Sequence, residues 1–114
     1  MSLERIFKAL VSLSLSETDA KIYIHLATKG PAIARMITKN LSINSGQVYR
    51  SLKHLQKKDI IKSNNEYPTE FSALPFEKVL DMLIELKEEQ AQDIKNRRKA
   101  LLSSWKKNEK KIVF

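Results

Sequence analysis

A helix over about residues 44–58 is the strongest structural prediction from this sequence. Within INSGQVYRSLKHLQKKDII, Val48, Leu52 and Leu55 recur at helical spacing, so one narrow stripe would be buried. The remaining surface of that helix would be polar and free of carboxylates. The preceding run, GPAIARMITKNL, predicts a shorter helix that ends near Asn40, with residues 41–43 as the link. Two helices joined by so short a turn predict a helix-turn-helix unit.

Two further helices are predicted before this unit. The first has one apolar stripe, formed by Leu3, Ile6, Phe7, Leu10 and Leu13. Ser16 and Asp19 resemble a capping box, so a second helix should begin at Glu17, run to about Thr28 and be the most buried of the domain. Gly30 and Pro31 suit the end of that helix and the start of the next.

Residues 60–74, IIKSNNEYPTEFSAL, predict a β-hairpin with its turn within residues 64–68. Its inward face would carry Ile61, Phe71 and Ala73. A hairpin that directly follows a helix-turn-helix unit is a wing. The predicted fold is therefore mainly α with a small β-hairpin, namely a winged helix-turn-helix domain over residues 1–75.

The second part, residues 76–114, predicts a long C-terminal helix with a basic tail. Pro75 can open this helix, which should continue without Gly or Pro from Phe76 to about Asn108. A helix of that length extends beyond a small domain and needs a partner. In the best heptad register, half of the a and d positions are apolar. We therefore expect the partner to be a second copy of the chain, in a homodimer formed through Leu80, Leu83, Ile94 and Leu101.

The charge distribution favours a polyanionic partner. The 114 residues carry a net charge of +8, divided into +5 over residues 1–75, −3 over 76–92 and +6 over 93–114. The absence of cysteine excludes disulfides and thiolate metal sites. No apolar run is long enough to span a membrane and no secretory signal is recognisable, so a cytoplasmic protein is expected.

No pattern for an enzyme is present. The sequence has no phosphate-binding loop, no nucleophile beside a base and no cluster of metal ligands, so neither catalysis nor a cofactor is expected. His25 and His54, the two histidines, have no Cys, Asp or Glu at ligand spacing, so no metal site is predicted. We expect His54 on the exposed side of the helix over residues 44–58.

The exposed face of this helix supplies groups that can contact double-stranded DNA. Gln47 can pair with adenine, and Arg50 with guanine or a phosphate, while Gly46 would let the helix start approach closely. The candidate contacts are Ser45, Gly46, Gln47, Arg50 and Lys53 from this helix, with Arg35 and Lys39 from the helix before it. Tyr49 is either a phosphate contact or a core aromatic residue. For the charged residues, the simpler alternative is a solvated surface.

The same residues resemble those of the TrmB-like transcription regulators, a mainly archaeal family with a winged helix-turn-helix domain. The resemblance covers about residues 10–90 and continues through Pro68, Phe71, Ala73 and Pro75 of the predicted wing. In order, the matching positions before the wing are Leu15, Ser16, Glu17, Ala20, Tyr23, Gly30, Pro31, Ser45, Val48, Tyr49, Leu52, Leu55 and Lys58.

The resemblance implies a regulator that binds a pseudo-palindromic DNA site as a homodimer, with the recognition helix in the major groove. Many members carry a basic wing tip where this chain has Thr69 and Glu70, so contact of the wing with DNA does not follow. Longer members add a sugar-binding domain, so the resemblance transfers no effector site to residues 1–114, and whether a small-molecule effector exists stays open. Two alternatives stay open, a winged helix that binds another protein and an architectural protein that binds DNA without sequence preference.

Overall fold

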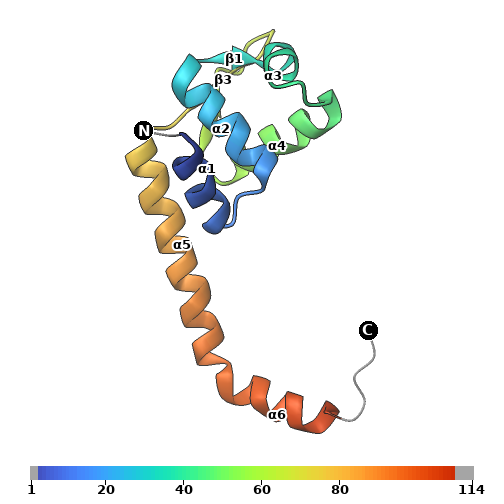
Figure 1. Cartoon of the computed structure of the whole chain (residues 1–114), viewed down its shortest axis with the longest axis vertical. Coiled ribbons are helices and arrows are strands. Elements are labelled where there is room, and N and C mark those ends of the chain that lie inside the picture. Colours follow the sequence, from blue (N-terminus) through green and yellow to red (C-terminus); the bar gives the residue numbers. More distant parts are fainter. Residues whose placement is uncertain (1–2, 110–114) are drawn as a thin grey trace.

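The structure is a computed structural model that describes residues 3–109 (Figure 1). Four helices, a small sheet and the first turns of α5 form the body of the molecule, and the rest of α5 and α6 extend away from it. The helices are α1 (Leu3–Ser12), α2 (Glu17–Lys29), α3 (Ala34–Leu41), α4 (Ser45–Lys57), α5 (Phe76–Asn96) and α6 (Arg98–Asn108). The strands are β1 (Ala32–Ile33), β2 (Ile61–Ser63) and β3 (Glu70–Ala73).

Helix α2 lies at the centre of the core, in agreement with the prediction that it is the most buried helix of the domain. Its side chains Ile22, Tyr23 and Leu26 are almost completely buried, and it packs against α1, α4 and β3. The Ser16 hydroxyl accepts a hydrogen bond from the backbone N–H of Asp19 at 3.0 Å, which caps the helix start. The apolar stripe of α4 packs against α2, so the position of α4 is set by the core.

The sheet has three antiparallel strands in the order β1-β3-β2, one strand more than the predicted hairpin. β1 pairs with β3 through Ala32 opposite Phe71, and β2 pairs with β3 through Ile61 opposite Ala73. The prediction that Ala32 and Ile33 begin a helix was therefore wrong, because this short extended segment finds a strand partner far along the chain. The prediction that Ile61 and Phe71 face inward is confirmed by their burial.

The helix-turn-helix unit is formed by α3 and α4. Helix α3 extends to Leu41, and Ser42 rather than Asn40 adopts the left-handed conformation that ends it. Helix α4 begins one residue later than the predicted limit, with Asn44 as its N-cap. The Asn44 Oδ1 atom accepts a hydrogen bond of 2.9 Å from the backbone N–H of Gln47. Local capping thus fixes where α4 starts.

The predicted continuous helix from Phe76 to Asn108 is interrupted. Arg97, at φ −100° and ψ 5°, separates α5 from α6, which turns away from the direction of α5 (Figure 1). Its backbone N–H is shared between the carbonyl oxygens of Asp93 and Ile94. Lys87 Nζ donates a hydrogen bond of 2.9 Å to the Ser14 hydroxyl, but from Glu88 to Glu109 every residue is exposed, so no buried side chain keeps this segment straight. In residues 3–109 no helix is both long and apolar enough to cross a membrane.

Candidate nucleic-acid interface

Helix α4 presents one buried and one exposed face. Val48, Leu52 and Leu55 are buried in the core, which confirms the stripe predicted from their spacing. Gln47, Arg50 and Lys53 project from the exposed part of the same helix. The core therefore fixes the rotation of α4 about its axis and determines which side chains a partner can reach.

The exposed face of α4 is electrostatically suited to a polyanion. Within residues 3–109, neither Arg50 nor Lys53 forms an ion pair with a carboxylate. Arg35 in α3 is likewise unpaired among the described residues. The positive charges of this surface are thus available to phosphates, which dominate the affinity of proteins for DNA.

Gly46 lies in the first turn of α4 and is exposed. A Cβ atom at this position would lie 3.4 Å from Asn44 Oδ1 and 3.5 Å from an Arg50 guanidinium nitrogen, which are ordinary contact distances. Its φ is also not in the left-handed region that favours glycine. The fold therefore does not require glycine at this position. Close approach of another molecule to Ser45 and Gly46 would require it, because there a side chain would be in the way.

Tyr49 is 61% exposed, so the core alternative considered for this residue does not hold. It lines a groove of about 420 Å³ between the helix-turn-helix unit and the wing. Arg35, Tyr67 and Thr69 line the same groove, and its walls combine a guanidinium group with aromatic and hydroxyl groups. Lys39, near the end of α3, is exposed outside this groove.

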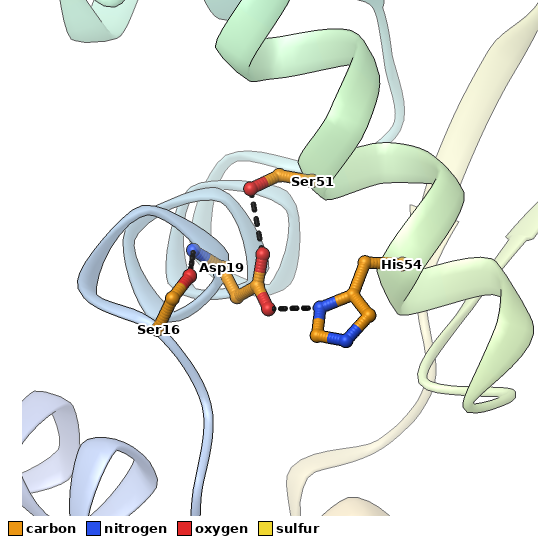
Figure 2. Close-up of polar contacts among 4 residues, drawn as sticks. All are labelled: Ser16, Asp19, Ser51 and His54. Carbon is orange, nitrogen blue, oxygen red and sulfur yellow. Dashed lines mark hydrogen bonds and ion pairs between the residues drawn. The ribbon is translucent and has the colours of Figure 1, made fainter. Parts of the chain in front are cut away.

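A polar cluster on the opposite flank of α4 was not predicted from the sequence (Figure 2). The Asp19 carboxylate, which is only 2% exposed, accepts a hydrogen bond of 2.6 Å from the Ser51 hydroxyl. Its other oxygen lies 2.6 Å from His54 Nδ1. The Asp19 side chain thus connects α2 to α4, although the capping-box pattern suggested a local role at the helix start.

His54 is half exposed, as expected, but its ring is held in one orientation by the Asp19 carboxylate. Beside the ring is a hollow of about 300 Å³ whose lining includes Gln47, Arg50 and Thr18. Among residues 3–109 no group of three or more His, Cys, Asp or Glu side chains could hold a metal ion. The pair formed by Asp19 and His54 is therefore a hydrogen-bonded contact between two helices.

The four predicted dimer residues lie in different environments. Leu83 is 2% exposed and packs in the core of its own chain, so it has almost no surface left for a partner. Leu80 is half-buried. Ile94 and Leu101 are about half exposed, on α5 and α6 respectively. Leu102 and Trp105 of α6 are also exposed, which adds apolar surface that the heptad register did not include.

One comparison of the sequence finds a short stretch of an enzyme. Over 52 residues the chain is 38% identical to the alpha subunit of phenylalanine–tRNA ligase from Methanopyrus kandleri. That stretch is 46% of this chain and 10% of the ligase subunit. The chain thus spans only a tenth of this curated relative.

Solved structures of other proteins share the fold. TrmBL2, described as an archaeal chromatin protein with a novel mode of DNA binding, aligns with a TM-score of 0.74 at 18% identity, over all of this chain and 45% of that one. A possible transcriptional regulator from Methanosarcina mazei Go1 aligns with a TM-score of 0.62 at 14% identity, over 83% of this chain and 87% of that one. A MarR family transcription regulator aligns with a TM-score of 0.56 at 14% identity, over 91% of this chain and 73% of that one.

The family is established by the sequence pattern described as "Sugar-specific transcriptional regulator TrmB", which matches residues 10–77. This range contains the helix-turn-helix unit and the wing, and it ends as α5 begins. The matching family is described as one of transcription regulators, and the fold neighbours are described as an archaeal chromatin protein and transcription regulators. The chain therefore belongs to the TrmB family of winged-helix transcription regulators.

Proposed function

We propose that this protein is a sequence-specific regulator of transcription that binds double-stranded DNA as a homodimer through α4. The observation that carries the proposal is the exposed, carboxylate-free face of α4, on which Arg50 and Lys53 have no acidic partner within residues 3–109. Its family and the positive charge of residues 1–75 support the same function.

In the proposed complex the first half of α4 lies in the major groove. Ser45 and Gly46 form the point of closest approach, and Gln47 and Arg50 reach the base edges. Lys53 contacts the sugar-phosphate backbone farther along the helix. Base contacts provide sequence preference, whereas phosphate contacts fix the orientation of the protein.

Two of the remaining candidates lie on the side of α4 that faces the wing, and the third lies at the end of α3. Arg35 and Tyr49 line one groove, and a phosphate placed there would accept hydrogen bonds from the guanidinium group and the phenol. Lys39 adds a charge at the end of α3. The wing itself contributes little charge, since Lys62 is its one cation and Glu66 and Glu70 are acidic.

We assign dimerisation to the exposed apolar side chains of α5 and α6. Ile94, Leu101, Leu102 and Trp105 each expose about half of their surface on a segment that is otherwise polar. Association of two copies would remove this apolar surface from water, which is favourable by about 25 cal/mol per Å². Two recognition helices would then contact half-sites about 10 base pairs, or a multiple of that distance, apart.

The first experiment tests binding and specificity together. Purified protein is mixed with fragments of its own genomic DNA at about 150 mM salt, a concentration at which weak nonspecific contacts are reduced, and the bound fragments are sequenced. Recovery of a few fragments with a shared two-fold motif is expected. Indiscriminate recovery would instead indicate an architectural protein, and no recovery would indicate a winged helix that binds another protein.

Variants then test the assigned surface. Arg50→Ala with Lys53→Ala should weaken binding at least tenfold, because each removes a phosphate or base contact worth about 1–3 kcal/mol. Lys21→Ala with Lys78→Ala removes the same charge from exposed positions on α2 and α5 and serves as the matched control. An equal loss in both double variants would contradict the assignment to α4.

The salt dependence gives a second test. If each protomer neutralises three or four phosphates, log K against log salt should have a slope of roughly −5 to −7 for the dimer. A flat response would remove the electrostatic basis of the proposal. Sedimentation of Leu101→Glu with Trp105→Glu, compared with the unaltered protein, tests whether α6 holds the dimer together.

A further inference from the structure

The flank of α4 that faces α2 carries a side chain outside the set of contacts proposed above. His54 projects into solvent one turn after Arg50, and its ring is anchored at one end by Asp19. The anchor is rigid, because the Asp19 carboxylate is buried and its second oxygen is bonded to the Ser51 hydroxyl.

The anchor determines what the free end of the ring can do. A carboxylate only accepts hydrogen bonds, so the hydrogen of the pair belongs to His54 Nδ1. When the ring is neutral, Nε2 then carries a lone pair and repels a phosphate oxygen. When the ring is protonated, Nε2–H becomes a charged donor that a phosphate oxygen can accept.

The surroundings of the ring match a phosphate diester. The adjoining hollow of about 300 Å³ is lined by the Arg50 guanidinium, the Gln47 amide and the hydroxyls of Ser16 and Thr18, all of which can donate hydrogen bonds. Asp19 is the only acid among the residues that line this hollow, and both of its oxygens are already engaged. An oxyanion placed there would meet donors on both α2 and α4.

The place of His54 along α4 favours the DNA backbone over the bases. Recognition helices contact base edges chiefly with their N-terminal residues. His54 belongs to the last turn of α4 and lies beyond Arg50. At that distance along the helix, the partner within reach is the sugar-phosphate backbone that borders the groove.

We propose that His54, oriented by Asp19 as a positioning residue, joins Arg50 in binding one backbone phosphate of DNA, and that this contact takes up a proton. The inference rests on the proposed function, since it requires α4 to bind DNA. It adds a phosphate subsite and a dependence on pH that the contacts of Gln47, Arg50 and Lys53 would not give.

Charged groups of both signs surround the His54 ring. From α2, the Asp19 carboxylate attracts the imidazolium. From α4 itself, Arg50, Lys53 and Lys57 line the hollows that border the ring and repel it. A bound phosphate adds negative charge on the open side, so DNA binding and protonation of His54 should strengthen each other.

Affinity for a duplex recovered from the genomic selection, measured at pH 8 and pH 6 over a series of salt concentrations, tests this inference. The unaltered protein should bind about tenfold more tightly per protomer at pH 6, the size of one charge-assisted hydrogen bond. The slope of log K against log salt should also steepen by about 0.9 per protomer, as expected for one more neutralised phosphate. Conformational effects of pH alone would not change the slope by this amount.

Three variants make the test specific. His54→Gln keeps a donor for Asp19 but cannot gain a charge, so it should lose both responses to pH. His54→Lys carries a permanent charge and should show the steeper slope at both pH values. His25→Gln, which alters the other histidine in a groove between α1 and α2, is the matched control and should retain both responses.

Asp19→Asn tests the positioning role. Asparagine can accept the hydrogen bond from Ser51, but its NH2 group would then face His54 Nδ1, which no longer finds an acceptor there, so the ring loses its orientation and the gain in affinity at pH 6 should shrink. Circular dichroism of each variant checks that the fold is retained. A pH response that persists in His54→Gln, or is absent from the unaltered protein, would overturn the inference even where Arg50→Ala weakens binding. Failure of the unaltered protein to bind any duplex would instead overturn the proposed function.

Discussion

The Tyr23 hydroxyl donates a hydrogen bond of 2.7 Å to the carbonyl oxygen of Leu74. This bond joins the middle of α2 to the residue that follows β3, across 51 positions of sequence. The Leu74 N–H in turn donates to the Ile60 carbonyl at 3.0 Å. The wing is therefore attached to the central helix by a side chain as well as by the packing of Ile61 and Phe71.

Tyr23→Phe should lower the free energy of unfolding by about 1 kcal/mol at neutral pH. The phenyl ring would still fill the core, but the Leu74 carbonyl would lose its donor, and one hydrogen bond contributes roughly 0.5–1.5 kcal/mol. Urea unfolding followed by circular dichroism measures the difference. No change would mean that water replaces the phenol without cost.

The difference in the free energy of unfolding between the unaltered protein and Tyr23→Phe should depend on pH. Burial raises the pKa of Tyr23 above its ordinary value of 10.0, so the folded protein holds this proton to a higher pH than the unfolded chain does. The contribution is fully present below pH 10 and declines as the pH rises above 10, where the unfolded chain ionises first. The lysines also titrate near pH 10, but they do so in both proteins, so their effect cancels when the stability of Tyr23→Phe is subtracted at each pH. The stability gap between the two proteins should narrow above pH 10 and stay constant from pH 7 to 9.

Asp59→Gly should stabilise the protein by about 0.5–1 kcal/mol. Asp59 follows α4 with a φ of 59°, and the Ile60 N–H bonds to the Leu55 carbonyl in the manner of a Schellman motif, a position that glycine fills without strain. Thermal unfolding of Asp59→Gly and Asp59→Ala separates the backbone effect from loss of the carboxylate. Alanine should give no gain, and equal gains would contradict the explanation.

Gly30→Ala should have the opposite effect, a loss of about 1–3 kcal/mol. Gly30 ends α2 with φ 95° and ψ 178°, a conformation that residues with a Cβ atom rarely adopt. No atom lies within 4 Å of the position that the Cβ would occupy, so the cost would come from the backbone rather than from a clash. Denaturant unfolding measures the loss, and an unchanged midpoint would show that the turn can relax.

Gly46→Ala should leave stability unchanged or raise it by up to about 1 kcal/mol, because the position is helical and a methyl group fits. Affinity for DNA should nevertheless fall about tenfold, roughly 1.4 kcal/mol, since the methyl group would separate the helix start from the groove. Unfolding and DNA binding are both measured on the same preparation. Undiminished affinity would remove Gly46 from the interface.

Helix α4 could be predicted because its determinants are local. The spacing of Val48, Leu52 and Leu55 gave the buried stripe, and Asn44 supplied the cap that starts α4. The strand at Ala32 could not be predicted in this way, because two residues have no periodicity and the pairing partner Phe71 lies 39 positions away. The interruption at Arg97 follows neither glycine nor proline, so composition gave no sign of it.

The cluster around Asp19 was missed for a related reason. Ser16 and Asp19 already made a plausible capping pattern, and only the structure brings Ser51 and His54 of α4 against that carboxylate. A sequence signal did exist, since Ser51 lies three residues from Val48 and beside Leu52 on the inner side of α4. A serine at a buried helical position requires a hydrogen-bond partner, and the neighbouring helix was the place to seek one.

The placement of Trp105 has a practical consequence. It is the only tryptophan of the chain, and it lies more than half exposed on α6, separated by α5 from the helices that would contact DNA. Indole fluorescence depends on the polarity around the ring, so the emission spectrum of this protein reports on the surroundings of α6 and hardly at all on folding of the core. A blue shift of the emission with rising protein concentration would therefore record the burial of α6 without a label. Binding at α4 should leave the emission unchanged.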